Sequence, residues 1–145
     1  MSELQADSLS PIDAATLWPQ LPRLDTEVIA TRGGENLFVT SGLAATGLTR
    51  LPRIARLPRT AVLGVKRGLG YRGVLVAREL SGGAGWETLS LRLARPKDDD
   101  TTIALIAGAF GEVARRGGRT MYLRYAEGSP HGDAIRRGGM FAYRL

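Results

Sequence analysis

Between residues 60 and 95, apolar and polar positions form three segments of strand length that are separated by glycine-rich turns. The segments are Ala61–Lys66, Val74–Glu79 and Trp86–Arg95. In the third segment every second residue from Leu89 to Leu93 is leucine and the residues between them are polar, which predicts a strand with one buried face. Three such strands joined by short turns predict an antiparallel meander.

The next pattern has the spacing of an amphipathic helix, from about Thr101 to Arg116. Its buried face is expected to hold the apolar residues Ile103, Ile106, Ala107, Phe110, Val113 and Ala114. Asp98–Asp100 supply an N-cap and favourable negative charge at the start of this helix. Gly117 and Gly118 end it.

Beyond the helix, Arg119–Tyr125 predicts a fourth strand. A strand, a helix and a strand within about 40 residues form a crossover unit, so the third and fourth strands are expected to be parallel. His131–Arg137 predicts a short helix, and Met140–Leu145 predicts a last strand. The sequence therefore predicts an α/β fold with a mixed sheet, in which an antiparallel meander is followed by a β-α-β-α-β order.

The first 59 residues carry weaker patterns. Pro11–Trp18 predicts a short helix after a frayed leader, and Glu27–Thr31 predicts a strand. We expect residues 1–25 to form the leader and short helix, and residues 26–145 to form a single domain. The pattern supports that domain best over residues 60–145.

Arginine recurs at every third position between Arg50 and Arg59. One interpretation is a basic arm that binds nucleic acid or an acidic membrane surface. The other is an irregular connection in which Leu51, Ile54 and Leu57 dock on the core while the arginines face water, because these apolar residues share the three-residue step. We favour the connection, and expect neither a nucleic-acid partner nor a membrane.

The amino-acid composition excludes several kinds of functional site. The chain has 145 residues, of which 43% are hydrophobic and 23% charged, and these values fit one globular domain. It has no cysteine and one histidine, which excludes thiolate chemistry and a multi-histidine cluster, so no metal site is expected. His131 could serve as a general base or a ligand, but we favour a residue that caps or flanks the short helix, because there is no other histidine or cysteine to share a metal with it. We find no apolar run that spans a bilayer and no secretion signal, and expect a cytoplasmic protein.

Three segments carry a resemblance to a known family. Phe110–Pro130 is similar to the long helix, the basic glycine stop and the following strand of the GNAT acyltransferase superfamily. Asp133–Phe141 is similar to that family's short helix and the Gly-Phe that leads into its next strand. Leu91–Pro96 is similar to the strand end that precedes its cofactor loop. The resemblance covers residues 60–145 and implies a GNAT-like acyl-CoA N-acyltransferase fold.

This resemblance implies an N-acyltransferase that uses acetyl-CoA as co-substrate and acts on a small-molecule or peptide amine. In the family, acetyl-CoA lies in a V between the two central parallel strands. Its diphosphate lies at the start of the long helix, here Pro96–Thr102, where unpaired N–H groups and the helix dipole favour an anion. The implied cofactor contacts are Leu93, Arg95, Lys97, Thr101, Thr102 and Ser129.

The resemblance also implies the catalytic residues. The family's base is often a carboxylate on the third strand of the meander, and Glu87 is the only carboxylate on that strand here. Glu87 is expected to share a face with Leu89 and Leu91, where partial burial would suit a general base. The alternative is that Glu87 is simply exposed at the start of the strand. The family's tyrosine on the short helix protonates the departing thiolate. The alignment puts Ile135 at that position, so Tyr143 is the expected acid, with Tyr125 as a second substitute.

The residues at the helix start favour a second function as well. In place of the family's basic glycine-rich loop stand Asp98–Asp100, which would repel a diphosphate, and Arg95 and Lys97 only partly offset them. The alternative is therefore a catalytically inactive GNAT-fold module used for dimerisation or partner binding. Because the chain stops at Leu145, we expect the family's C-terminal strand to be missing, and an unpaired edge of this kind favours a homodimer.

Overall fold

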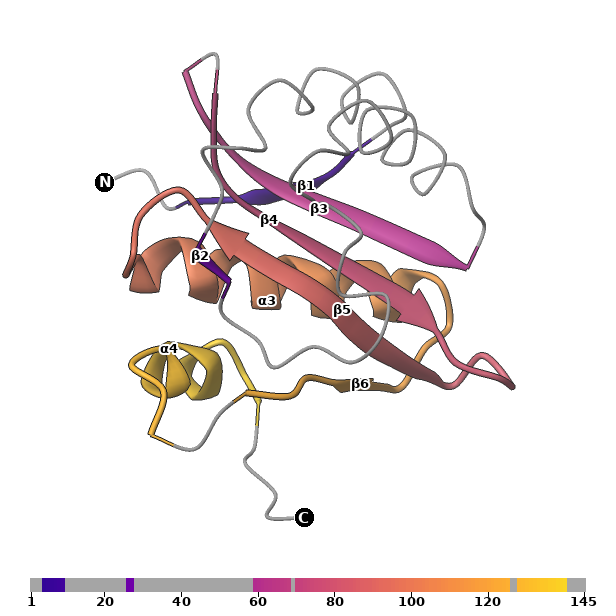
Figure 1. The fold of residues 1–145 in the computed structure, drawn as a ribbon. Helices are drawn as coiled ribbons and strands as arrows, with labels where there is room; N and C mark the ends of the chain where they lie inside the picture. Colours follow the sequence, from indigo (N-terminus) through magenta and orange to yellow (C-terminus); the bar gives the residue numbers. More distant parts are fainter. Residues whose placement is uncertain (1–3, 10–25, 28–58, 69, 126–127, 141–145) are drawn as a thin grey trace, which may run out of the picture.

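The structure is a computed structural model that describes residues 4–9, 26–27, 59–68, 70–125 and 128–140. Within these residues six strands form one mixed sheet, in the order β1-β3-β4-β5-β2 with β6 also paired to β5. Figure 1 shows helix α3 crossing one face of this sheet, with the shorter helix α4 beside it. The expected α/β class is confirmed.

The centre of the sheet is the predicted meander. It consists of β3 (Thr60–Arg67), β4 (Gly70–Glu79) and β5 (Gly85–Leu93), which pair antiparallel in that order. Strand β4 begins four residues earlier than its apolar pattern, because Gly70 and Tyr71 still pair with Arg67 and Lys66. The first turn is therefore shorter than the sequence predicts.

Two short strands extend the sheet on either side. β1 (Ala6–Ser8) pairs antiparallel with β3. The expectation of a frayed leader is wrong at this point, because Ala6 packs closely against Gly108 of α3. β2 (Thr26–Glu27) pairs antiparallel with β5, and of the strand predicted over residues 27–31 only Glu27 lies among the described residues.

The crossover unit is also confirmed. α3 (Asp99–Arg115) leads to β6 (Thr120–Tyr122), and β6 pairs parallel with β5. α4 (Gly132–Arg137) follows as the predicted short helix. The other expected elements of the chain, namely the helix at 11–18, the basic segment before Arg59 and the strand after Met140, lie outside the described residues.

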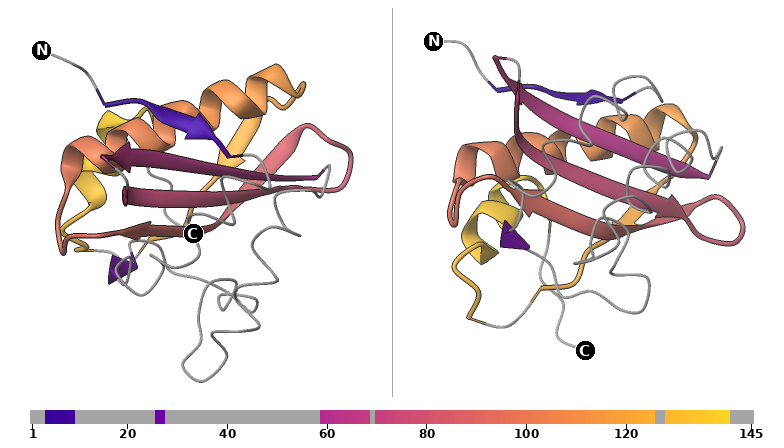
Figure 2. Two further views of the ribbon diagram at one scale, coloured as in Figure 1. Left: turned by 90° about the horizontal axis from the view of Figure 1, so that it is seen from above. Right: turned by 45° about the horizontal axis from the view of Figure 1, so that its top comes forward.

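The buried stripe of α3 differs from the predicted apolar face. It holds Thr101, Thr102, Leu105, Ile106, Ala109, Glu112 and Val113. Ala107 and Ala114, which were expected to be buried, are exposed. The polar Glu112 lies on the stripe because Arg115 and Arg116 both donate hydrogen bonds to its carboxylate, so its charge is paired where it is buried. Figure 2 shows α3 running along one face of the meander.

Gly73 of β4 lies directly under the first turn of α3. A Cβ atom at this position would be 2.8 Å from Thr101 Cγ2 and 3.0 Å from Leu105 Cδ1. Glycine therefore allows the helix to start in contact with the strand.

We expect Gly73→Ala to lower the free energy of unfolding by about 1–3 kcal/mol, because the added methyl group displaces a packed helix. Gly111→Ala is the matched control. Gly111 is an exposed position of α3 with open space around it, and alanine there is expected to be neutral or to stabilise by up to about 1 kcal/mol. Urea denaturation of both variants measures the difference. Equal stability would contradict the close seating of α3 on β4.

Candidate active site

The parallel strands β5 and β6 separate along their length. Their pairing ends where Glu87 lies opposite Tyr122, although β5 continues to Leu93. Residues Leu123–Tyr125 no longer have strand conformation. In Figure 1 the chain after β6 moves away from β5 towards α4. This divergence is the V expected between the two strands.

Strand β2 occupies the outer part of the same edge of β5. β4 pairs with one edge of β5 between Trp86 and Leu93, so β6 and β2 share the other edge, and β2 lies opposite Arg92 and Leu93. Among the described residues, none pairs with that edge over Thr88–Leu91. At about 3.3 Å per residue, the open stretch is about 13 Å long.

Leu93 differs in its placement from the cofactor contact that the sequence implied. Its side chain is fully buried in the core, and its backbone pairs with Gly73 on one edge and Thr26 on the other. Leu93 therefore offers a ligand neither an exposed side chain nor an open backbone edge.

Glu87 lies at the closed end of the V. A β-bulge lies within the open stretch, because Val76 pairs with Ser90 and Ala77 with Thr88, which leaves Leu89 without a partner on β4. The extra residue reverses the alternation of faces. Leu91 and Trp86 belong to the core, so Glu87, next to Trp86, points to the opposite face of the sheet.

The expectation that Glu87 and Leu91 share a face is therefore wrong. The Glu87 side chain is 26% exposed and lies 3.4 Å from Arg78 on the neighbouring strand, with which it forms an ion pair. It is held in a polar position at the point where β6 leaves β5.

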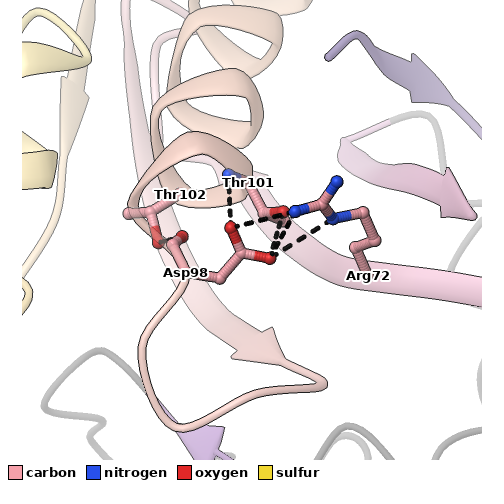
Figure 3. A network of polar contacts seen from close by, with 4 residues as sticks. All are labelled: Arg72, Asp98, Thr101 and Thr102. Atoms are coloured by element: carbon pink, nitrogen blue, oxygen red, sulfur yellow. Dashed lines mark hydrogen bonds and ion pairs between the residues drawn. The ribbon is translucent and has the colours of Figure 1, made fainter.

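The start of α3 is built around the carboxylate of Asp98 (Figure 3). Oδ1 accepts a hydrogen bond from the Thr101 backbone N–H at 3.2 Å, and Oδ2 accepts one from the Thr101 hydroxyl at 2.6 Å. The Arg72 guanidinium of β4 donates to both oxygens over 3.2 to 3.4 Å. The cap predicted from the sequence is confirmed, and Arg72 is a partner that the sequence did not indicate.

The hydroxyl groups of the two threonines in this turn also form hydrogen bonds within the turn. The Thr102 hydroxyl donates to the Asp98 carbonyl oxygen at 2.9 Å. Thr101 and Thr102 are fully buried. Both hydroxyl hydrogens are thus taken by Asp98, and neither of these expected cofactor contacts reaches the surface in this structure.

Asp98 keeps its negative charge although it is buried. Burial raises the pKa of its carboxyl group, but the hydrogen bonds from Thr101 and the nearby Arg72 guanidinium outweigh this effect and hold the pKa below its ordinary value. At neutral pH an anion therefore occupies the N-terminus of α3 permanently.

A diphosphate at the helix start would need free N–H groups and an excess of positive charge. Here the Asp98 carboxylate already accepts from Thr101, and Asp99 and Asp100 add two acidic groups in the first turn. Of the two expected basic contacts, Arg95 is exposed and Lys97 lies 4.0 Å from the Asp99 carboxylate. The residues present at this helix start do not fit a diphosphate.

Two of the other expected residues, Ser129 and Tyr125, lie near the start of α4. The Ser129 hydroxyl oxygen accepts a hydrogen bond from the His131 backbone N–H at 3.2 Å, which shapes the turn before the helix. Tyr125, after β6, has its ring close to Gly132. Ile135 is buried in the core, and Tyr143 lies outside the described residues.

His131 precedes α4 and is only 6% exposed. It flanks the helix, and its side chain makes no capping hydrogen bond. Burial lowers the pKa of its imidazole, and this effect together with the charge of Lys97 outweighs the opposing charge of Asp99. His131 is therefore neutral at pH 7.

Gly138 packs on Ile106, so α4 runs alongside α3 with both helix starts at the open end of the V.

Two general features of the described residues bear on function. No three His, Asp or Glu side chains among them converge to hold a metal ion. No helix among them combines the length and apolar character needed to cross a membrane.

We expect Asp98→Ala to lower the free energy of unfolding by about 1–2 kcal/mol at pH 7, because α3 loses its cap and Arg72 its counter-charge. Asp100→Ala, at an exposed position of the same turn, is the control and should cost a few tenths of a kcal/mol. The lowered pKa of Asp98 stabilises the fold above the ordinary aspartate pKa, and this contribution is lost as the pH falls below about 4. Urea denaturation at several pH values should therefore show the two variants converging in acid.

His131 gives the second pH-dependent prediction. Because its pKa is lowered in the fold, the unfolded chain binds a proton more readily, and stability falls as the pH drops below about 6.5. His131→Gln should remove this loss between about pH 7 and about pH 5. The chain has one histidine, so no other imidazole contributes to the difference. Thermal unfolding of both proteins at the two pH values measures it, and identical pH profiles would refute the burial of a neutral imidazole.

We compared the chain with known protein families, curated proteins and solved structures. No protein-family model and no curated protein sequence matches the chain. Among solved structures it is similar to the ribosomal-protein-alanine N-acetyltransferase from Brucella melitensis biovar Abortus 2308, with a TM-score of 0.62 and 13% identity over 99% of this chain and 95% of that chain.

Two further similar structures cover less of their own chains. An aminoglycoside 6'-acetyltransferase type Ii has a TM-score of 0.51 and 16% identity over 78% of this chain and 66% of that chain. The aminoglycoside 6'-N-acetyltransferase from Enterococcus faecium has a TM-score of 0.50 and 15% identity over 78% of this chain and 57% of that chain. At these identities the likeness is one of architecture, and this chain has the GNAT N-acetyltransferase fold.

Proposed function

We propose that this chain is an N-acyltransferase domain that moves an acyl group from a thioester donor, acetyl-CoA in the simplest case, to an amine. The observation that supports it is the separation of β5 from β6 beyond Glu87 and Tyr122. Backbone N–H and C=O groups need partners, and an open strand edge accepts an extended chain that carries amides. The Thr88–Leu91 edge suits the pantetheine arm of such a donor.

The transfer needs a base and an acid. The protonated amine gives a proton to Glu87, its nitrogen attacks the thioester carbonyl, the carbon–nitrogen bond forms and the carbon–sulfur bond breaks. The leaving thiolate then takes a proton from a tyrosine. The surplus proton of the new amide nitrogen passes through solvent to the tyrosinate, and Glu87 returns its proton to solvent. Tyr143 is our proposed donor from the sequence, and Tyr125, beside the start of α4, is the described alternative.

The acceptor is an amine of a peptide or of a small molecule. The names of the similar structures include both kinds, a ribosomal-protein alanine and an aminoglycoside. The face of the sheet opposite α3 is the side from which we propose that the amine approaches, because Glu87 points there.

One observation favours a second candidate function. The Asp98 carboxylate fills the helix start that would otherwise hold a diphosphate. A chain that has lost this anchor is also suited to serve as a non-catalytic module, binding a partner or a second copy through its fold. The two candidates differ in whether any thioester binds.

Thiol release tests the proposal directly. With acetyl-CoA and a panel of amines that includes an N-terminal alanine peptide, we expect release that falls about 10²–10⁴-fold in kcat for Glu87→Gln, with an unchanged KM for the donor. Glu79→Gln on β4 is the matched control and should keep full activity. An equal rate for Glu87→Gln would exclude Glu87 as the base. Absence of both turnover and thioester binding by calorimetry would leave the non-catalytic module.

A further inference from the structure

We infer that the acyl donor of this domain is recognised through its pantetheine arm, and that a nucleotide diphosphate contributes nothing to its affinity. This inference rests on the proposed function and concerns the same V. It would make a pantetheine thioester as good a ligand as the corresponding CoA thioester.

The first argument is that the anion position of α3 is already filled. The Asp98 carboxylate receives the hydrogen bonds of Thr101 that an external phosphate oxygen would receive. Figure 3 shows the helix start and the Arg72 guanidinium directed at this one carboxylate. The Asp98 side chain is only 7% exposed, so a ligand would have to displace a buried ion pair in order to bind there.

The second argument is the charge around this position. Arg72 is engaged with Asp98, and Lys97 is paired with Asp99, so of the basic residues at this helix start only Arg95 has no acidic partner among the ion pairs described. Asp100 in the first turn opposes it. Acidic and basic groups therefore balance, and the surface offers a diphosphate no net attraction.

The third argument is the length of the open edge. β2 pairs with Arg92 and Leu93, and so ends the open stretch of β5 before the chain reaches α3. Among the described residues, about 13 Å of backbone edge remains without a partner over Thr88–Leu91, enough for an arm with two amide groups. The structure thus keeps an edge for the arm while the helix start is closed to the diphosphate.

Calorimetry on the whole chain tests the inference with three probes: CoA, pantetheine and 3'-phospho-ADP, the nucleotide part of CoA alone. We expect CoA and pantetheine to bind with dissociation constants within about threefold of each other, and 3'-phospho-ADP not to bind. CoA binding tenfold or more tightly than pantetheine, or saturable binding of 3'-phospho-ADP, would overturn the inference and leave the proposed function intact. If neither CoA nor pantetheine binds, both fail.

A variant with Asp98→Asn, Asp99→Asn and Asp100→Asn tests the cause. Asparagine is a good N-cap, so the helix is expected to form, which circular dichroism checks. The variant frees Arg72 and removes three negative charges, and should make CoA bind about tenfold more tightly than pantetheine. Asp7→Asn, Glu79→Gln and Gly111→Lys together are the matched control, with the same change in net charge away from the start of α3. A preference for CoA in the control as well, or in neither variant, would refute the role of Asp98.

Discussion

The contact between Asp98 and Arg72 fixes how helix α3 sits on the sheet. The same carboxylate caps the helix and holds the guanidinium of β4, next to the glycine that allows the first turn to touch the strand. α3 is the connection between β5 and β6, so the position of its first turn determines where β5 ends and from which side the chain returns. The geometry of the V therefore depends on how the first turn of α3 contacts β4.

The bulge in β5 and the loss of pairing with β6 lie side by side in the sequence. A bulge increases the local twist and bends its strand, so a straight neighbour cannot follow it. β6 pairs up to Glu87, and the bulged residue Leu89 comes two positions later. β2 then covers the far end of the edge. Among the described residues, the open stretch is therefore short, because it contains the bulge and ends at the pairing with β6 on one side and at the pairing with β2 on the other.

The elements that the sequence predicted are those with local signals. Alternation marked the meander, helical spacing marked α3, and the acidic residues before it marked its cap. The face of Glu87 was not predictable, because one extra residue reverses the alternation and nothing in Leu89 distinguishes it from its neighbours. Arg72 was missed because it lies 26 residues from Asp98. β1 was missed because Ala6–Ser8 pair through the backbone and carry no apolar pattern.

The cap of α3 shows how helix stability and anion binding compete for the same atoms. The first N–H groups of a helix can be satisfied by a side chain of the chain itself or by an external anion, and the internal carboxylate is always present at high effective concentration. Once Arg72 neutralises that carboxylate in a buried position, exchange for a solvated phosphate brings no gain that offsets the separation of the pair. The fold can thus keep the strand edge on which we propose that an acyl donor is aligned, while the helix start serves a structural role. Any affinity for such a donor must then come from the contacts along β5.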